Sequence, residues 1–150
     1  MEASQQLRDI ISISIPDFDC EEGWRSIIES AILCIDRYYK RRAAVEEHRM
    51  ADNDSVIAKI HPSQGLEIVQ IKEKFGGLRI YCNYHDDYIN GIIALAETMA
   101  YRTCEVTGGN GSLHKKGGWF KTVSPDFASA HGYEPAQHNH RRAVNSDVQI

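Results

Sequence analysis

The chain has 150 residues, of which 42% are hydrophobic and 25% are charged, and this composition is typical of one soluble globular domain. It has 17 Lys and Arg residues against 21 Asp and Glu residues, so the formal net charge is −4, which argues against a protein that coats DNA. The four cysteines stand far apart with no C-x-x-C pair, which argues against a disulfide scaffold and an intact zinc ribbon. Cys34 and Cys82 fall on apolar faces, where we expect free thiols in the core.

The sequence carries no signal for export or membrane insertion. No apolar run approaches the roughly 18 residues that a membrane span needs. The first residues include Glu2 and Asp9 in place of the basic start of a leader peptide. We therefore expect a cytoplasmic protein with no membrane partner.

The first predicted element is short. Residues 9–15 alternate isoleucine with serine, and Pro16 ends the pattern. This alternation predicts a strand, or alternatively an extended arm that pairs with the edge of another chain.

A long helix is predicted next. Its core-facing stripe consists of Trp24, Ile28, Ala31, Ile35 and Tyr38. These residues recur every three or four positions, as one face of a helix requires. We expect Asp19 or a neighbour to cap its start, and its charged far end to protrude or to fade near residues 52–54, within a connection that runs to Gly65.

Residues 66–74 and 78–84 are two β-rich runs joined by Gly76 and Gly77, which predicts an antiparallel hairpin. Alternation in the second run places Leu78, Ile80 and Cys82 on one face. In the first run, Ile68 next to Val69 breaks the alternation, so we expect either a bulge or a strand buried on both faces.

The last third predicts a second helix and a glycine-rich segment. Asp86 or Asp87 caps a helix that ends near Thr103. Five glycines between residues 104 and 118 predict tight turns. Residues 119–123 predict a strand, Ser124 begins a short helix, and the segment from residue 134 is expected to be flexible.

The predicted hairpin lies within a ten-residue motif. Residues 72–81 read Lys72-Glu73-Lys74-Phe75-Gly76-Gly77-Leu78-Arg79-Ile80-Tyr81. Further motifs, in chain order, are Gly23-Trp24, Ala96-Glu97, Thr103-Cys104-Glu105, Thr107-Gly108, Gly118-Trp119 and Lys121-Thr122. Over residues 20–133 the chain thus resembles a family of uncharacterised phage and prophage proteins that carry the signature K-E-K-F-G-G-L-R-F-Y. The resemblance implies a phage-associated setting in the host cell cytoplasm and no settled activity.

The resemblance also bears on Cys104. Many members of that family carry a small zinc ribbon after the second helix, with ligands in C-E-x-C-G and T-L-C-x-x-H contexts. Here Cys104 remains, and the other three ligand positions hold Thr107, Ser124 and Phe127. A structural zinc site needs four N or S ligands. We therefore expect a ribbon-like knuckle without metal, in which Trp119 and Phe120 pack together.

The hairpin motif gathers basic side chains around a glycine turn. Lys72 and Lys74 share one face of their strand, and Arg79 can join them across the ladder. An arginine fork near glycine amides is suited to an anion. The alternative is a solvated edge on which Glu73 pairs with a lysine. Tyr81, on the Arg79 face, predicts either a stacking platform for a base or ordinary half-buried packing.

A second basic segment lies between Gly108 and Gly118 and contains Lys115 and Lys116. It matches no Walker A loop and opens no helix with G-x-G-x-x-G, so alone it predicts a turn-rich connection. Beside the hairpin it would complete one basic, glycine-lined surface. The ligand-binding residues predicted there are Lys72, Lys74, Phe75, Gly76, Gly77, Arg79, Tyr81, Lys115, Lys116 and Trp119.

Two histidine motifs predict structure rather than catalysis. His138-Asn139-His140 lies in the predicted tail, and His85-Asp86-Asp87 precedes a helix, where capping is favoured over metal binding. We find no set of residues that supplies a nucleophile, a base and an oxyanion donor, so we predict no enzymatic activity, no metal and no cofactor.

The sequence as a whole predicts a single α+β domain. We expect an N-terminal arm or strand (1–18), two helices on an antiparallel hairpin (19–103), a degenerate ribbon knuckle (104–133) and a flexible tail (134–150). The predicted function is a phage-type binding protein that counters host defence by capturing a nucleotide-like anion or a host protein. The alternative is a nucleic-acid-binding accessory protein. A homodimer through the arm or the hairpin edge stays open.

Overall fold

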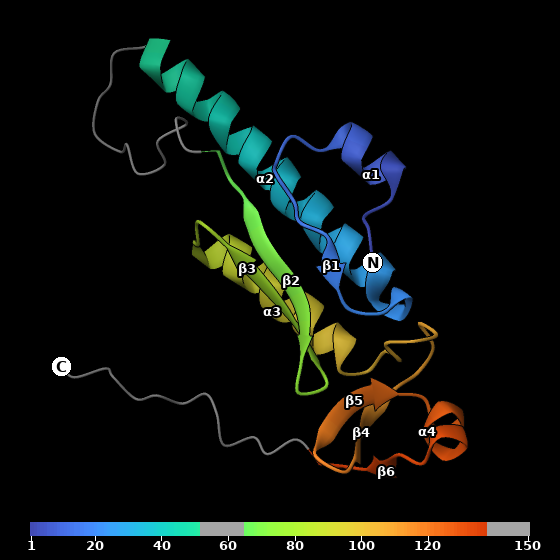
Figure 1. The fold of residues 1–150 in the computed structure, drawn as a ribbon. Helices are drawn as coiled ribbons and strands as arrows, with labels where there is room; N and C mark the ends of the chain where they lie inside the picture. The colour runs from blue at the N-terminus through green and yellow to red at the C-terminus, as the bar shows by residue number, and fades with distance from the viewer. Residues whose placement is uncertain (52–64, 138–150) are drawn as a thin grey trace, which may run out of the picture.

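The computed structural model describes residues 1–51 and 65–137 and has an α+β fold (Figure 1). In chain order the elements are α1 (Gln5–Ile10), β1 (Phe18–Asp19), the 3-10 helix η1 (Glu22–Trp24), α2 (Arg25–Ala51), β2 (Ile68–Lys74), β3 (Gly77–Cys82), α3 (Asp87–Ala100), β4 (Ser112–Lys116), β5 (Trp119–Val123), α4 (Pro125–His131) and β6 (Glu134–Pro135). The described strands form two three-stranded sheets, β1-β2-β3 and β5-β4-β6. Among the described helices, none is long and apolar enough to cross a membrane.

No regular strand forms at residues 9–15: α1 takes in residues 9 and 10, and residues 11–15 are extended with a bridge from Ser14 to Glu67 of this chain, whereas the alternative was an arm that pairs with another chain. Ser4 caps α1 by accepting a hydrogen bond from the Leu7 amide at 3.2 Å, and Leu7 is buried. The chain is then extended. Ser14 forms a parallel bridge with Glu67, just before β2, and β1 pairs in parallel with β2 itself. Asp19 therefore lies in a strand and does not cap α2. The extended segment covers an edge of its own sheet.

The predicted stripe is confirmed; it begins at Trp24 in η1 and continues along α2. Trp24, Ile28 and Ile35 are fully buried against the first sheet, in a core that the buried face of α3 completes. The helix extends past the sheet at its C-terminal end (Figure 1). Cys82 belongs to the same core, but the prediction for Cys34 is wrong, because its side chain is exposed on the flank of α2.

The hairpin prediction is confirmed, including the bulge at Ile68 and Val69, where the register of β2 against β3 shifts. Its turn differs from a simple glycine turn, since both Phe75 (φ 53°) and Gly76 (φ 77°) have left-handed backbone. This pair of positive φ angles matches the two-residue turns that suit the twist of a hairpin.

The free edge of β3 is covered by α3. Asp86 caps this helix by accepting from the Ile89 amide at 2.9 Å, as predicted. The Glu97 carboxylate of the same helix accepts a hydrogen bond from the Ile80 amide of β3. The arm is thus paired with the sheet of its own chain, and the edge of β3 meets a side chain of α3 at Ile80.

The C-terminal part is a second small unit with its own cluster of Cys104, Val123 and Ala128. The strand at 119–123 and the helix after Ser124 are confirmed, and Gly132 ends α4 with φ 69°. Residues 112–116, expected to be turns, form β4 between β5 and β6. Residues 134–136, expected to be flexible, are instead paired with β4 through β6 and through the Ala136 amide, which donates to the Leu113 carbonyl; residues 138–150 of the predicted tail lie outside the described residues. Most of the 51–65 connection and residues 138–140 lie outside the described residues.

The predicted packing of Trp119 and Phe120 inside the knuckle is wrong. Trp119 is 80% exposed and Phe120 is 37% exposed. The buried contacts come instead from Val106, Phe127 and Tyr133 around the Cys104 cluster. Trp119 and Phe120 therefore lie on the surface and are not part of this core.

Candidate binding surface

The half-buried Arg79 side chain is engaged by its own neighbours. One guanidinium nitrogen lies 2.6 Å from the Leu78 carbonyl and 3.4 Å from the Glu97 carboxylate, and the other lies 3.0 Å from the Tyr101 hydroxyl. The arginine thereby ties β3 to the end of α3. An anion that used this fork would have to compete with these partners.

The two glycines of the motif are required by close packing. A Cβ at Gly77 would lie 2.4 Å from the Tyr101 hydroxyl, and a Cβ at Gly76 would lie 2.3 Å from the Leu113 side chain. The Gly76 amide already donates to the Glu73 carboxylate. Close packing thus accounts for both glycines, and the Gly76 amide already has a partner within the turn.

The remaining residues of the motif stand on the outer face of the hairpin. Lys72 pairs with Arg79 across the ladder, and its ammonium lies 5.5 Å from the centre of the Tyr81 ring. The Lys74 ammonium lies 5.7 Å from the centre of the Phe75 ring, which is 68% exposed. Cations and aromatic rings thus alternate along this face and around the turn.

The turn of this hairpin reaches the second sheet (Figure 1). Thr122 of β5 donates a hydrogen bond from its hydroxyl to the Gly76 carbonyl, and Leu113 of β4 packs against Gly76. Lys115 and Phe120 pair with each other and lie two residues beyond Leu113 and Thr122 along their strands. Because alternate residues share a face, Lys115 and Phe120 lie on the face that receives the turn.

We call this set the aromatic–lysine surface; it consists of Lys72, Lys74, Phe75, Tyr81, Lys115 and Phe120. Phe120 was not predicted as part of it. Phe120 can be identified only from the pairing of residues 112–116 with residues 119–123. The sequence did not predict that pairing, because the glycines around residues 112–116 indicate turns.

Lys116 and Trp119 do not join this surface. They pair with each other on the opposite face of β4 and β5, where the Lys116 ammonium donates to the His131 carbonyl at 2.8 Å. The same ammonium lies 5.8 Å from the centre of the Tyr133 ring. The structure therefore places Lys116 and Trp119 apart from the other residues of the predicted site.

The other motif residues meet where the two units join. The Trp24 indole donates to the Thr103 carbonyl at 2.8 Å, and the Gly23 amide donates to the Glu105 carbonyl at 2.7 Å. A Cβ at Gly23 would lie only 2.2 Å from the Cys104 carbonyl oxygen. These contacts fix the start of α2 against the segment that leads into the knuckle.

No protein-family model, curated protein or solved structure matches this chain. The resemblance to the phage family thus remains a prediction from motif residues, several of which the structure uses to hold its two units together.

The junction buries a carboxylate. Glu105 is 2% exposed, and burial raises the pKa of its carboxyl above the ordinary value, while the Lys121 ammonium opposes this rise. Lys121 lies 3.8 Å from one Glu105 oxygen and 3.3 Å from Glu21. That Glu105 oxygen has no hydrogen-bond partner among the described residues, so the ion pair is its main compensation.

The expected ribbon positions come together around Cys104. Burial alone would raise the pKa of this thiol, but hydrogen bonds from the Thr107 hydroxyl and from the amides of Thr107, Ser124 and Val106 lower it overall. Phe127 stacks on His131 with ring centres 3.9 Å apart. Within the described residues, no three His, Cys, Asp or Glu side chains are grouped so as to hold a metal ion.

Proposed function

We propose that the protein is a non-enzymatic binding protein that captures a nucleotide-like anion on the aromatic–lysine surface. The observation that carries this proposal is the conformation of Phe75. A left-handed backbone costs an L-residue about 1–2 kcal/mol, and glycine or asparagine is the usual choice in such a turn. Phe75 has φ 53° and leaves 68% of its surface in solvent, so neither turn geometry nor core burial accounts for a phenylalanine there.

The chemistry around Phe75 supports a phosphate-bearing aromatic ligand. Exposed rings stack on bases, and lysine ammonium groups attract phosphates. Lys72, Lys74 and Lys115 form no ion pair with a carboxylate among the described residues. Such a surface binds and orients an anion, but its members do not pair a nucleophile with a base.

The resemblance to phage proteins suggests what such binding would be for. A small phage protein that sequesters a nucleotide signal would counter host defence without catalysis. Docking on a host protein is the other use of the same surface, since exposed aromatic residues also anchor protein interfaces.

Binding of single-stranded nucleic acid is the second candidate. Phe75, Tyr81 and Phe120 give more than one ring on which successive bases could stack. The net charge of −4 disfavours a long polyanion, which makes a small ligand the first choice.

Lys115→Ala tests the surface directly, with Lys116→Ala as a matched control on the opposite face. Calorimetric titration with a panel of cyclic and linear nucleotides should detect a ligand, and Lys115→Ala should weaken its binding about tenfold or more, because a charged contact to phosphate is lost. Lys116→Ala should leave the affinity unchanged.

Three results would count against the proposal. If no nucleotide binds, or if both lysine variants bind equally well, the aromatic–lysine surface is not the site. If only oligonucleotides bind, with an affinity that falls steeply as salt is raised, the nucleic-acid candidate replaces it.

A further inference from the structure

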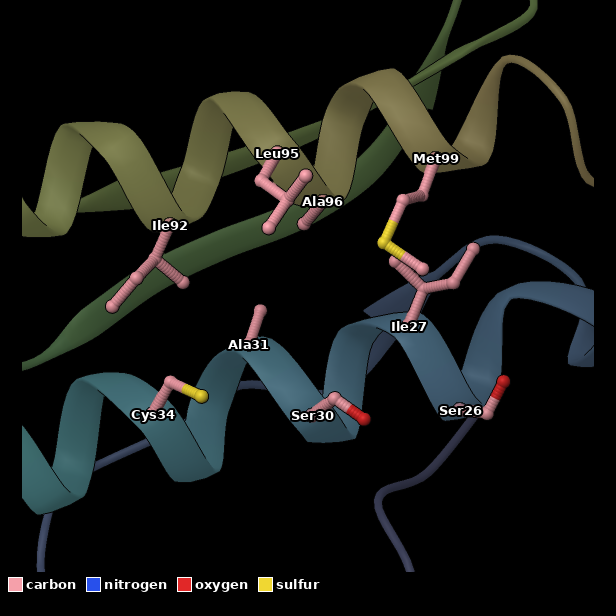
Figure 2. Close-up of a pocket in the computed structure, with 9 residues that line it drawn as sticks. All are labelled: Ser26, Ile27, Ser30, Ala31, Cys34, Ile92, Leu95, Ala96 and Met99. Atoms are coloured by element: carbon pink, nitrogen blue, oxygen red, sulfur yellow. The ribbon is translucent and has the colours of Figure 1, made fainter.

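An apolar groove lies between α2 and α3, apart from the residues of the aromatic–lysine surface. Its volume is about 230 Å³. It is lined from α2 by Ser26, Ser30 and Cys34 and from α3 by Ile92, Leu95 and Met99 (Figure 2). The groove is smaller than the roughly 300–1,000 Å³ of sites that enclose a small molecule, so its shape favours a docked surface.

The α3 wall is a ridge of exposed apolar side chains. Tyr88, Leu95 and Met99 are 53%, 62% and 48% exposed and lie seven and four residues apart, which places them on one face of the helix. Tyr88 is held by stacking on Tyr38, with ring centres 4.3 Å apart. Scattered exposed apolar residues are ordinary, whereas a continuous ridge beside a groove is typical of an interaction site.

The α2 wall is formed by small side chains. Ser26, Ser30 and Cys34 are exposed and recur every four residues, so they lie on one face of α2 opposite the ridge. Met99 reaches from α3 into the space between the helices (Figure 2). Because the side chains from α2 are small and those from α3 are large, the groove leaves room for the side chains of a third helix.

Basic residues stand at both ends of the groove. Arg37 and Arg41 continue the α2 stripe three and seven residues beyond Cys34, and Arg102 follows Met99 at the end of α3. All three arginines are exposed and form no ion pair with a carboxylate of the described residues. The start of α3 lies beside Tyr38, while Met99 lies beside Ile27, so Arg37 and Arg41 are at one end and Arg102 is at the other.

We propose that this groove receives an amphipathic α-helix of a partner protein that carries acidic residues at both ends. The apolar face of that helix would pack between Leu95, Met99 and the small residues of α2, and its carboxylates would face the arginines. A second copy of this chain fits less well. The α2 and α3 stripes contain no carboxylate, so two copies would bring arginines together without compensation.

The full-length protein tests this inference with a fluorescein-labelled synthetic peptide. The peptide carries leucines at three- and four-residue spacing and glutamates at both ends, and a scrambled peptide of the same composition is the control. Fluorescence anisotropy should show binding of the patterned peptide only. Leu95→Glu should weaken it about tenfold or more, because a charge then lies where apolar contact is made.

A matched variant keeps the test independent of folding. Ala94→Glu adds the same charge at an exposed neighbouring position that does not line the groove, and it should bind the peptide like the wild type. The double variant Arg37→Glu, Arg41→Glu should also weaken binding. The inference fails if the scrambled peptide binds equally, if neither peptide binds, or if Leu95→Glu behaves like Ala94→Glu. A dimer of this chain that Leu95→Glu dissociates would assign the groove to a second copy instead.

Discussion

Replacing Gly23 with alanine is expected to lower the free energy of unfolding by about 3 kcal/mol or more. The new Cβ would lie 2.2 Å from the Cys104 carbonyl oxygen and 2.5 Å from that of Glu105. These are backbone atoms and cannot rotate away as a side chain can. The shift would also break the hydrogen bond from the Gly23 amide to the Glu105 carbonyl. Urea unfolding followed by circular dichroism measures the loss.

Gly91 provides the control for this substitution. It lies within α3, and a Cβ at this position would meet no atom within 4 Å. Gly91→Ala should therefore raise the free energy of unfolding by about 0.5–1 kcal/mol, because alanine favours a helix more than glycine does. Equal effects of the two substitutions would show that the junction at Gly23 is not tightly packed.

Replacing Lys121 with methionine has the second large effect. It leaves the Glu105 carboxylate buried without its cation, and breaking a buried pair in this way costs about 3–5 kcal/mol. Methionine keeps most of the aliphatic packing of the lysine, so the loss reports charge. Adding Glu105→Gln removes the uncompensated charge and should restore a large part of the stability. If the double variant is as unstable as Lys121→Met, packing rather than charge explains the effect.

The pH dependence of Lys121→Met follows from the raised pKa of Glu105. A carboxyl whose pKa is higher in the folded protein favours folding while it is protonated, and this advantage is lost as the pH rises through the folded pKa. Without Lys121 that pKa rises further. The penalty should therefore be largest at neutral pH and should shrink below the ordinary glutamate pKa of about 4.3, where Glu105 is protonated in both states. The free energy of unfolding of the wild type and of Lys121→Met, measured at neutral pH and at a pH below the ordinary glutamate pKa, tests this.

Local patterns in the sequence predict the elements whose hydrogen bonds and burial are also local. The α2 stripe, the hairpin, the Asp86 cap and the helix after Ser124 are of this kind. Residues 9–15 were mispredicted because the same alternation of isoleucine and serine fits both a regular strand and an extended segment, and the pairing that separates the two, here a bridge from Ser14 to Glu67, is not local. Cys34 is exposed because it lies at the groove between α2 and α3, and the sequence does not reveal how closely these two helices approach each other.

The binding surface was predictable only in part, for the same reason. The lysines, Phe75 and Tyr81 follow from strand alternation within one hairpin. The contact of Gly76 with Leu113 and Thr122 links residues far apart in the chain, and it decides that Lys115 and Phe120 join the surface while Lys116 and Trp119 do not. The engagement of Arg79 by Tyr101 is equally non-local.

The most direct test of the proposed function is Phe75→Gly, measured for both thermal unfolding and nucleotide binding. Glycine adopts the left-handed backbone of this turn without strain, so the unfolding midpoint should stay the same or rise by a few degrees. The stacking ring is lost, so nucleotide affinity should fall about tenfold or more. A variant that binds as tightly as the wild type, or that unfolds at a clearly lower temperature, would show that Phe75 serves the fold and would contradict the proposal.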